Sequence, residues 1–170
     1  MNRRTALAIV LGGWAVGTLF MWAVATQNFA TVDRILAEPA SAFRSITAAL
    51  DSGHAREILR YEASELNRFY FDRWGYAQVL LALLGVALAW KGGRRLRAAI
   101  LVAAVIAVGL QFYVVPETIR IGRSIDFQPR EPETARQAEF WRLHNAYTGL
   151  DMLKFLIIAG CGIALLRERD

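Results

Sequence analysis

The sequence predicts an all-α integral membrane protein: a four-helix bundle with amphipathic helices in its first external segment. Hydrophobic residues make up 55% of the 170-residue chain, whereas a soluble domain contains about 45–50%. This excess is gathered into four long apolar runs, and basic residues lie at the ends of the runs in a pattern that favours one orientation in a bilayer. We expect one membrane domain over residues 1–170.

The four predicted spans cover about residues 5–26, 70–90, 98–115 and 145–166, with external segments at 27–69 and 116–144. Crossing ~30 Å of hydrocarbon takes about 20 helical residues. The second span has the shortest uninterrupted apolar run, which begins at Gly75. The aromatic stretch FYFDRW before it provides an interfacial start for this span.

Basic side chains predict the orientation of the spans. They precede the first span, fill the turn KGGRRLR between the second and third spans, and follow the fourth span. The two longer connecting segments balance acidic and basic residues. The positive-inside rule then places both termini in the cytoplasm of a multi-pass protein in the bacterial cytoplasmic (inner) membrane. The formal charge of +5 becomes a topology signal, and no nucleic-acid partner is expected.

The N-terminal run has a second interpretation. The basic start MNRR, the apolar run and the stretch AVAT also resemble a cleaved secretory signal peptide. The apolar run is long for such a signal, so we expect residues 5–26 to be a retained anchor.

The external segments are expected to be partly helical. Segment 27–69 has two stretches with helical spacing, separated by Pro39 and an SGH turn. We expect short amphipathic helices at the outer surface, the second of which can continue into the second span. Segment 116–144 is proline-rich and predicts a loop or short helix. A final helix over about 132–167 would be about 54 Å long, so its start should project from the bilayer.

The last predicted span has charged residues inside its apolar part. The uncharged stretch after Lys154 runs only to Leu166 and makes about 18 Å of helix, which is too short to cross. Lys154 must therefore lie within the hydrocarbon, with Asp151 one turn nearer the outer surface on the same helix face. An intramembrane charge costs about 2.5–3.5 kcal/mol unless it is paired or solvated. This face should therefore turn into the bundle.

Polar residues from the other spans occur at a similar depth in the outer half of the bundle. They predict an outward-facing polar pocket formed by Gln27, Asn28, Gln78, Gln111, His144, Asn145, Asp151 and Lys154. Two interpretations of this pocket remain open. The charged pair is either an ion pair that holds helices in register or a site for a ligand, ion or proton.

The sequence contains no recognisable catalytic or cofactor motif. P-loop, nucleophile-elbow, HExxH and dinucleotide patterns are missing, as is the Cys/His spacing of a metal site, so no catalytic residue, metal ligand or cofactor is predicted. His144 is the one candidate ligand for haem or a chlorophyll-type pigment. Most tryptophans lie near span boundaries and indicate an interfacial belt. Gly13 and Gly17 form a small-xxx-small pair that we expect to serve internal packing.

Three stretches resemble a known family. ATQNFATVDRILAEP, YEASELNRFYFDRWGYAQ and FWRLHNAYTGLDMLK are similar to segments of a bacterial four-span membrane family of unknown function that is itself similar to transmembrane protein 205. The resemblance implies a compact four-helix membrane bundle and carries over no catalytic residue. Its motif positions map onto Gln27, Asn28, Arg34, Glu65, Asn67, Arg68, His144 and Asn145.

We therefore expect a non-catalytic membrane protein, an accessory or structural subunit of a larger complex. Its expected partners are the lipid bilayer and other membrane subunits. One alternative is a small transporter or ligand-binding protein that uses the polar pocket around Asp151 and Lys154. A second alternative is a haem- or pigment-binding subunit that uses His144.

Overall fold

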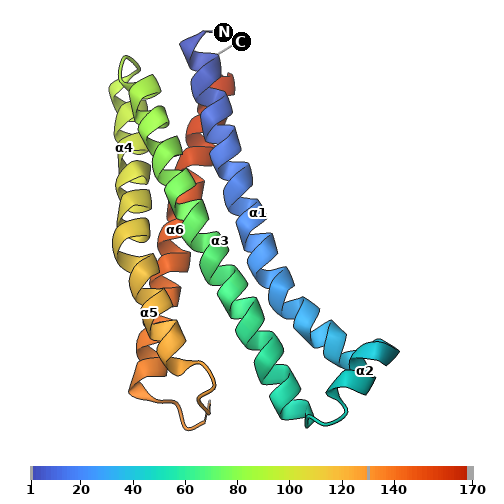
Figure 1. Ribbon diagram of the computed structural model, residues 1–170. Coiled ribbons are helices and arrows are strands. Elements are labelled where there is room, and N and C mark those ends of the chain that lie inside the picture. The colour runs from blue at the N-terminus through green and yellow to red at the C-terminus, as the bar shows by residue number, and fades with distance from the viewer. Residues whose placement is uncertain (1, 130, 168–170) are drawn as a thin grey trace.

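A computed structural model describes residues 2–129 and 131–167, and every regular element in these ranges is helical. The elements are α1 (Arg3–Ala37), α2 (Ser41–Thr47), α3 (Ser52–Ala89), α4 (Arg94–Gly109), the π-helical turn η1 (Leu110–Val114), α5 (Val115–Ile125) and α6 (Ala135–Arg167). The all-α class predicted from the sequence is confirmed. Figure 1 shows the long helices running side by side.

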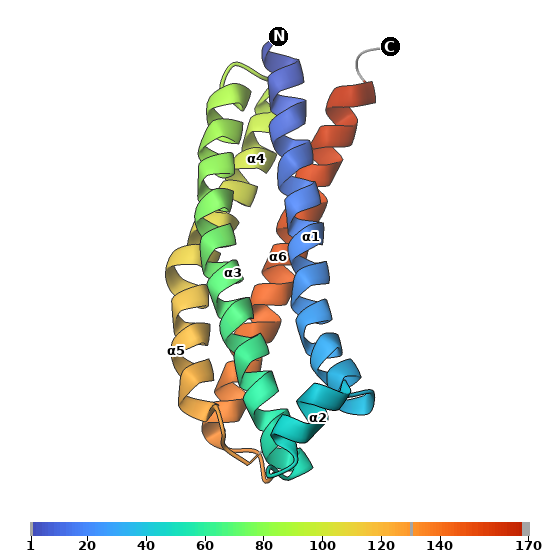
Figure 2. The ribbon, with the colours of Figure 1, turned by 45° about the vertical axis from the view of Figure 1, so that its right-hand side comes forward.

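The long helices pack around one apolar core. α1 packs against α3 and α6, and α4 packs against the same two helices. The core cluster consists of Leu7, Leu11, Trp14, Ala82, Ala89, Ile100, Ala103, Ala107, Ile158 and Leu165. Both termini and the α3–α4 turn lie at one end of the molecule, and α2 lies at the other (Figures 1 and 2).

Three helices in the described part of the chain are long and apolar enough to cross a membrane: Arg3–Ala37, Arg94–Ile125 and Ala135–Arg167. The sequence predicted four spans. The remaining long helix, α3, has 38 residues, but the predicted apolar run from Gly75 occupies only its second part. Polar side chains precede this run, so the apolar stretch of α3 is shorter than those of the other three.

The first external segment differs in part from the prediction of short surface helices. α1 continues without a break to Ala37, and only α2 is a separate short helix. α3 begins at Ser52 and runs through the predicted second span, which agrees with the expected continuation of the second external helix. The C-terminal part of α1 is held against the rest of the molecule by Val32, which is 4% exposed. Asp51 caps the start of α3 by accepting a 2.9 Å hydrogen bond from the backbone N–H of His54.

The third predicted span also continues beyond its expected end at residue 115. Pro116 lacks a backbone N–H, and its ring would clash with a carbonyl of the preceding turn in a regular α-helix. Here the wide turn η1 ends at Val114, two residues before Pro116, and α5 continues from Val115. A π-helical turn adds a residue and displaces the preceding carbonyls. Of the two possibilities predicted for the segment after residue 115, a loop or a short helix, the structure has the short helix α5.

The long C-terminal helix agrees with the prediction, with its start at Ala135 instead of residue 132. Thr134 and Gln137 form a capping box. The backbone N–H of Gln137 donates to Oγ1 of Thr134 at 3.2 Å, and the N–H of Thr134 donates to Oε1 of Gln137 at 2.7 Å. Pro132 lies before the helix, and Gln137 is also tied to the loop through a 2.8 Å bond to the carbonyl of Pro129.

Candidate functional site

The two charged side chains within α6 are enclosed by the protein. Asp151 is 1% exposed and Lys154 is 0% exposed. They lie one turn apart, and their side chains form a salt bridge. The face that carries them points towards α1 and α3, because its remaining partners come from those two helices.

Lys154 has partners on three helices. Its Nζ donates to a carboxylate oxygen of Asp151 on α6 and to Oε1 of Gln78 on α3, and it lies 5.8 Å from the ring centre of Trp14 on α1. Trp14 Nε1 also donates to Gln78 Oε1, at 3.0 Å. One amide oxygen therefore accepts hydrogen bonds from both the indole and the ammonium group.

Asp151 is bonded through both carboxylate oxygens. Oδ1 accepts from Lys154, and Oδ2 accepts a 2.8 Å hydrogen bond from Nε1 of Trp22 on α1. The Trp22 ring in turn packs on Phe155, with a centroid distance of 5.3 Å. Hydrogen bonds that involve a charged group are stronger than neutral ones. α1 is joined to α6 by the hydrogen bond from Trp22 to Asp151 and, nearer its start, by the contact of the Trp14 ring with Lys154.

We call this set of residues the polar core: Trp14, Trp22, Gln78, Asp151 and Lys154. It is electrically neutral overall. A buried ion pair contributes to stability only where further hydrogen bonds satisfy its remaining donors and acceptors. The indole and amide groups here provide such bonds from two other helices.

The remaining predicted pocket residues lie elsewhere. Gln111, in η1, is 2% exposed, and its Nε2 donates to Oδ1 of Asp72 at 3.3 Å. Its Oε1 has no hydrogen-bond partner among the described residues. The amide lies against Gly75, where a Cβ atom would come 1.5 Å from Oε1. Gln111 is therefore a contact of α3 and is not among the polar-core bonds.

Residues towards the end of the molecule opposite the termini are more exposed. Gln27, His144 and Asn145 are exposed, and the ring of His144 stacks on Phe140 at 6.0 Å. Asn28 donates a 2.6 Å hydrogen bond to Asn67, which joins the C-terminal part of α1 to the N-terminal part of α3. Of the eight predicted pocket residues, the structure brings Gln78, Asp151 and Lys154 into direct contact.

The sequence prediction missed the two tryptophans of the polar core. Trp14 is 0% exposed and lies in the middle of the first predicted span. This position was the available signal, because an interfacial belt residue belongs at the end of a span. An indole in the middle of a span needs a hydrogen-bond acceptor for its N–H. Gln78 and Asp151 were the polar candidates in the neighbouring predicted spans.

A second group of charges lies outside the polar core and joins α3 to α5. Arg68 donates to both carboxylate oxygens of Asp126, at 2.7 and 2.8 Å, and to Glu65 at 2.6 Å. Arg123 makes two further bonds to Glu65, at 3.0 and 2.8 Å. Hydrogen bonds from Arg123 and then Arg68 lower the pKa of Glu65 from 4.5 to about 2.

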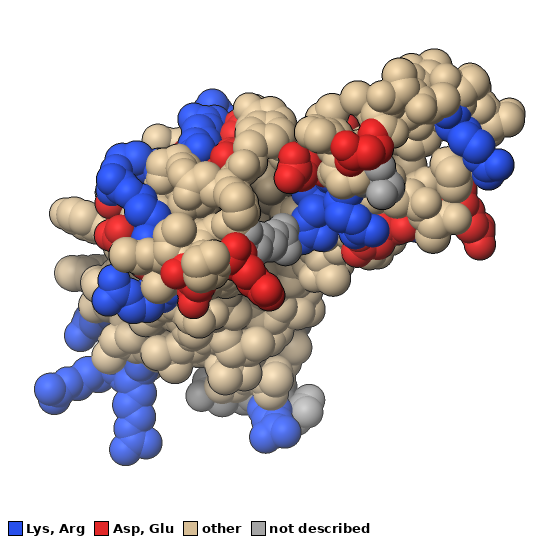
Figure 3. All heavy atoms as spheres, turned by 90° about the horizontal axis from the view of Figure 1, so that it is seen from below, with Lys and Arg blue, Asp and Glu red and all other residues tan. Residues whose placement is uncertain are grey.

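The end of the molecule opposite the termini carries both kinds of charge. Figure 3 looks at this end and shows acidic and basic side chains interspersed. The end with the termini is different. Its described charged side chains are all basic: Arg3, Arg4, Lys91, Arg94, Arg95, Arg97 and Arg167. This contrast is the asymmetry that the positive-inside rule describes.

No family model matches the chain, and no curated protein or solved structure shows significant similarity to it. Within the described residues there is also no group of three His, Cys, Asp or Glu side chains placed to hold a metal ion.

Proposed function

We propose that the chain is a four-span protein of the cytoplasmic membrane, with both termini on the cytoplasmic side, that acts as a non-catalytic accessory or structural subunit of a larger membrane complex. The observation that carries this proposal is the polar core. Its charged atoms make their bonds within the chain: Lys154 donates to Gln78, and Asp151 accepts from Trp22. A charged pair satisfied in this way holds helices in register.

The path of the chain supports α3 as the fourth span. α1 and α4 both begin at the end that carries the termini (Figure 1). If α1 and the continuous helix from α4 to α5 cross the bilayer, then α3, which connects them, must return across it. Its apolar half exposes Leu80 and Leu83, at 59% and 63%, as a lipid-facing surface would. The resemblance to a four-span family is consistent with this arrangement.

Single-cysteine labelling tests the topology in a Cys161→Ser background. A cysteine at Gly93, in the α3–α4 turn, should react with a membrane-impermeant maleimide only after the cells are opened. A cysteine at Ser45, in α2, should react in cells whose outer barrier is permeabilised but whose inner membrane is intact. The reverse pattern, or equal labelling at both sites, contradicts the proposed topology.

A role as a subunit is supported by the large apolar side chains that remain exposed on the predicted spans. Val16 and Phe20 on α1 are each 66% exposed, and Val105 on α4 is 71% exposed. These surfaces suit lipid or a neighbouring subunit. A photo-crosslinker at Val16 or Val105 should join the chain to one defined protein in native membranes. Crosslinking to lipid alone from both positions would argue against a subunit role.

The alternative is a small transporter or ligand-binding protein, which is favoured by the presence of two ionisable side chains inside a predicted span. The double variant Asp151→Asn/Lys154→Met separates the two functions. It removes both charges and keeps an acceptor for Trp22. A structural pair predicts a folded variant that still assembles and supports growth. A transport site predicts a variant that folds and assembles but loses its cellular role.

A further inference from the structure

The short helix α2 and the chain on either side of it, residues 36–55, form a corner at the end of the molecule opposite the termini. This α2 corner projects sideways from the long helices (Figure 1), and its surface is mostly uncharged when viewed from this end (Figure 3). α2 makes few contacts with the other helices, and none of its residues is buried. A helix of seven residues is marginal in isolation, so a partner packed against it would stabilise the corner.

Lipid does not cover the α2 corner if α1 crosses the bilayer, which is the one respect in which this inference rests on the proposed function. The first predicted span ends at about residue 26, and α1 continues to Ala37, a further ~16 Å of helix. The headgroup layer on each side of the hydrocarbon is only about 5–8 Å thick. The corner therefore lies in water, where a contiguous apolar surface indicates a site of protein interaction.

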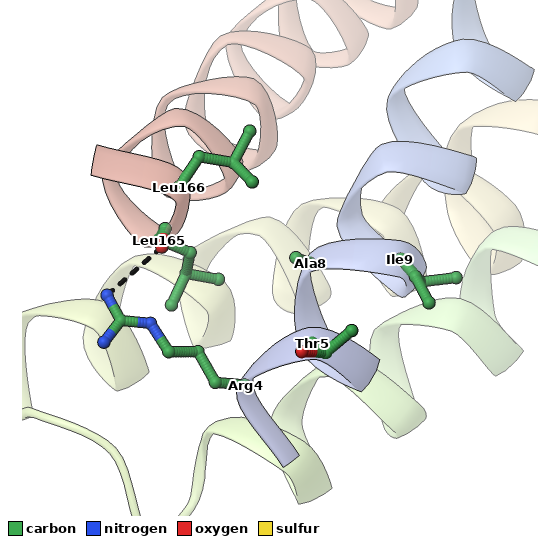
Figure 4. A pocket seen from close by; sticks show the side chains of 6 residues that line it. All are labelled: Arg4, Thr5, Ala8, Ile9, Leu165 and Leu166. Carbon is green, nitrogen blue, oxygen red and sulfur yellow. Dashed lines mark hydrogen bonds between the residues drawn. The ribbon is translucent and has the colours of Figure 1, made fainter. Parts of the chain in front are cut away.

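Exposed apolar side chains on the long helices have a different neighbour. The groove between the first turns of α1 and the last turns of α6, for example, has exposed walls at Ile9 and Leu166 (Figure 4). Both residues lie within the predicted spans, where lipid tails are as apolar as the side chains that they cover. A groove in this position needs no protein partner, whereas the α2 corner has no such cover.

The α2 corner carries both a groove and an exposed apolar side chain of a size to fill it. The groove has a volume of about 220 Å³, and its apolar walls include Leu36, Pro39, Phe43, Leu50 and Ala55. Ile46, three residues after Phe43, is 80% exposed, the highest value among the large apolar side chains that the structure describes. Pockets for drug-sized ligands measure about 300–1,000 Å³, so this smaller groove suits a protein side chain.

Two exposed side chains of opposite charge lie beside the groove. Arg44 lines it, and Glu38 immediately precedes Pro39, another lining residue. Neither charged side chain has a hydrogen-bond or ion-pair partner among the described residues, although Arg34 lies one turn before Glu38 on α1. The corner therefore offers one cation and one anion for contacts with another molecule.

We propose that the α2 corner binds the same corner of a second copy of this chain. In a two-fold symmetric contact both copies present the same surface, which must be complementary to itself. Ile46 of each copy enters the groove of the other, and Arg44 of each copy pairs with Glu38 of the other. The corner is small, so the dimer is a weak one. It forms in the membrane, where confinement in one orientation raises the effective concentration of the two copies.

Photo-crosslinking of the purified full chain in proteoliposomes tests the contact in the absence of other proteins. p-Benzoyl-phenylalanine placed at Ile46 should give an adduct of twice the chain mass of 19.0 kDa that contains two differently tagged copies. The same crosslinker at Ser45, which points about 100° away around α2, should give much less. Equal yields from the two positions at high dilution in lipid, or no dimer from Ile46, would overturn the proposal.

Charge reversal tests the pairing across the interface. Arg44→Glu and Glu38→Arg should each weaken dimerisation by about tenfold, because symmetry makes each change replace two ion pairs with two repulsive contacts. The double variant, and an equimolar mixture of the two single variants, should restore the dimer because each places opposite charges face to face again. Arg136→Glu, the same charge change at an exposed position on α6, should have no effect. Failure of both restorations, or an equal loss with Arg136→Glu, would refute the paired contact.

A separate check covers misfolding and topology. The substituted side chains are all exposed, so circular dichroism melting should show no difference from the wild type. Dimerisation in proteoliposomes does not depend on which side of the cell membrane the corner faces. Absence of the dimer therefore counts against the α2 contact, whereas inverted cysteine labelling in cells counts against the proposed function.

Discussion

The indole of Trp74 on α3 lies directly on Gly17 of α1. A Cβ atom at Gly17 would come 2.2 Å from Cη2 of Trp74, whereas a Cβ atom at Gly13, one turn earlier, would have no neighbour within 4 Å. The two glycines of the GGWAVG stretch therefore differ in role. Gly17 provides the space in which α1 and α3 approach each other, and Gly13 faces outward.

We predict that Gly17→Ala destabilises the protein and that Gly13→Ala does not. The added methyl group at Gly17 must displace a bulky aromatic ring, and overpacking of this kind typically costs about 1–3 kcal/mol. Unfolding by sodium dodecyl sulfate in mixed micelles, followed by circular dichroism, measures the difference. Equal stability of the two variants would mean that Trp74 moves aside without cost.

Removing one charge of the polar core should be more harmful than removing both. Lys154→Met leaves the Asp151 carboxylate buried with only Trp22 as its partner, and breaking a buried pair in this way costs about 3–5 kcal/mol. The double variant Asp151→Asn/Lys154→Met has no buried charge and should recover most of this loss. A double-mutant cycle in the same unfolding assay gives the coupling between the two residues. Additive losses would contradict a structural pair.

The indole N–H of Trp22 should contribute more than that of an exposed tryptophan. Trp22→Phe keeps an aromatic ring against Phe155 but removes the donor to Asp151, and a hydrogen bond to a charged group is worth about 1.5–3 kcal/mol. Trp141→Phe is the control, because Trp141 is 51% exposed. Equal stability of the two variants would show that Asp151 finds another donor.

Acid should loosen the contact between α3 and α5. The pKa of Glu65 is lowered from 4.5 to about 2. Its ionised form therefore stabilises the fold fully above pH 4.5, and this contribution is lost as the pH falls from 4.5 towards 2. The melting temperature of the wild type should fall across this window more steeply than that of Glu65→Gln. The exposed neighbour Glu62 provides the control substitution Glu62→Gln, which should leave the wild-type slope unchanged.

The sequence predicted α6 well because its signals are local. Only a short apolar stretch separates Lys154 from the basic residues after the predicted span. If the span crosses a bilayer, Lys154 and Asp151 then lie within the hydrocarbon, and their charges are predicted to be sheltered by the protein. Their burial, at 1% or less, follows from insertion energetics and needs no knowledge of neighbouring helices. The partners of the pair were harder to predict. Gln78 was identified by depth, but the two tryptophans depend on how far α1 is rotated towards α6, which composition does not encode.

The helix continuing through Pro116 could not be predicted for a related reason. Proline usually ends a helix, and the compensating wide turn lies in ordinary residues, LQFYV. Nothing in their side chains distinguishes a π-helical turn from an α-helical one. The continuation of α1 beyond its predicted end is similar, because it depends on contacts such as the Asn28–Asn67 bond, between residues far apart in the chain.

The wide turn Leu110–Val114 also sets the direction in which the side chains of α5 point. One extra residue rotates the downstream helix by about 100° relative to an unbroken α-helix. With this rotation, Arg123 on α5 meets Glu65 on α3. Deleting a single residue here would leave the length of the helix nearly unchanged, but it would swing that arginine away from its acidic partner.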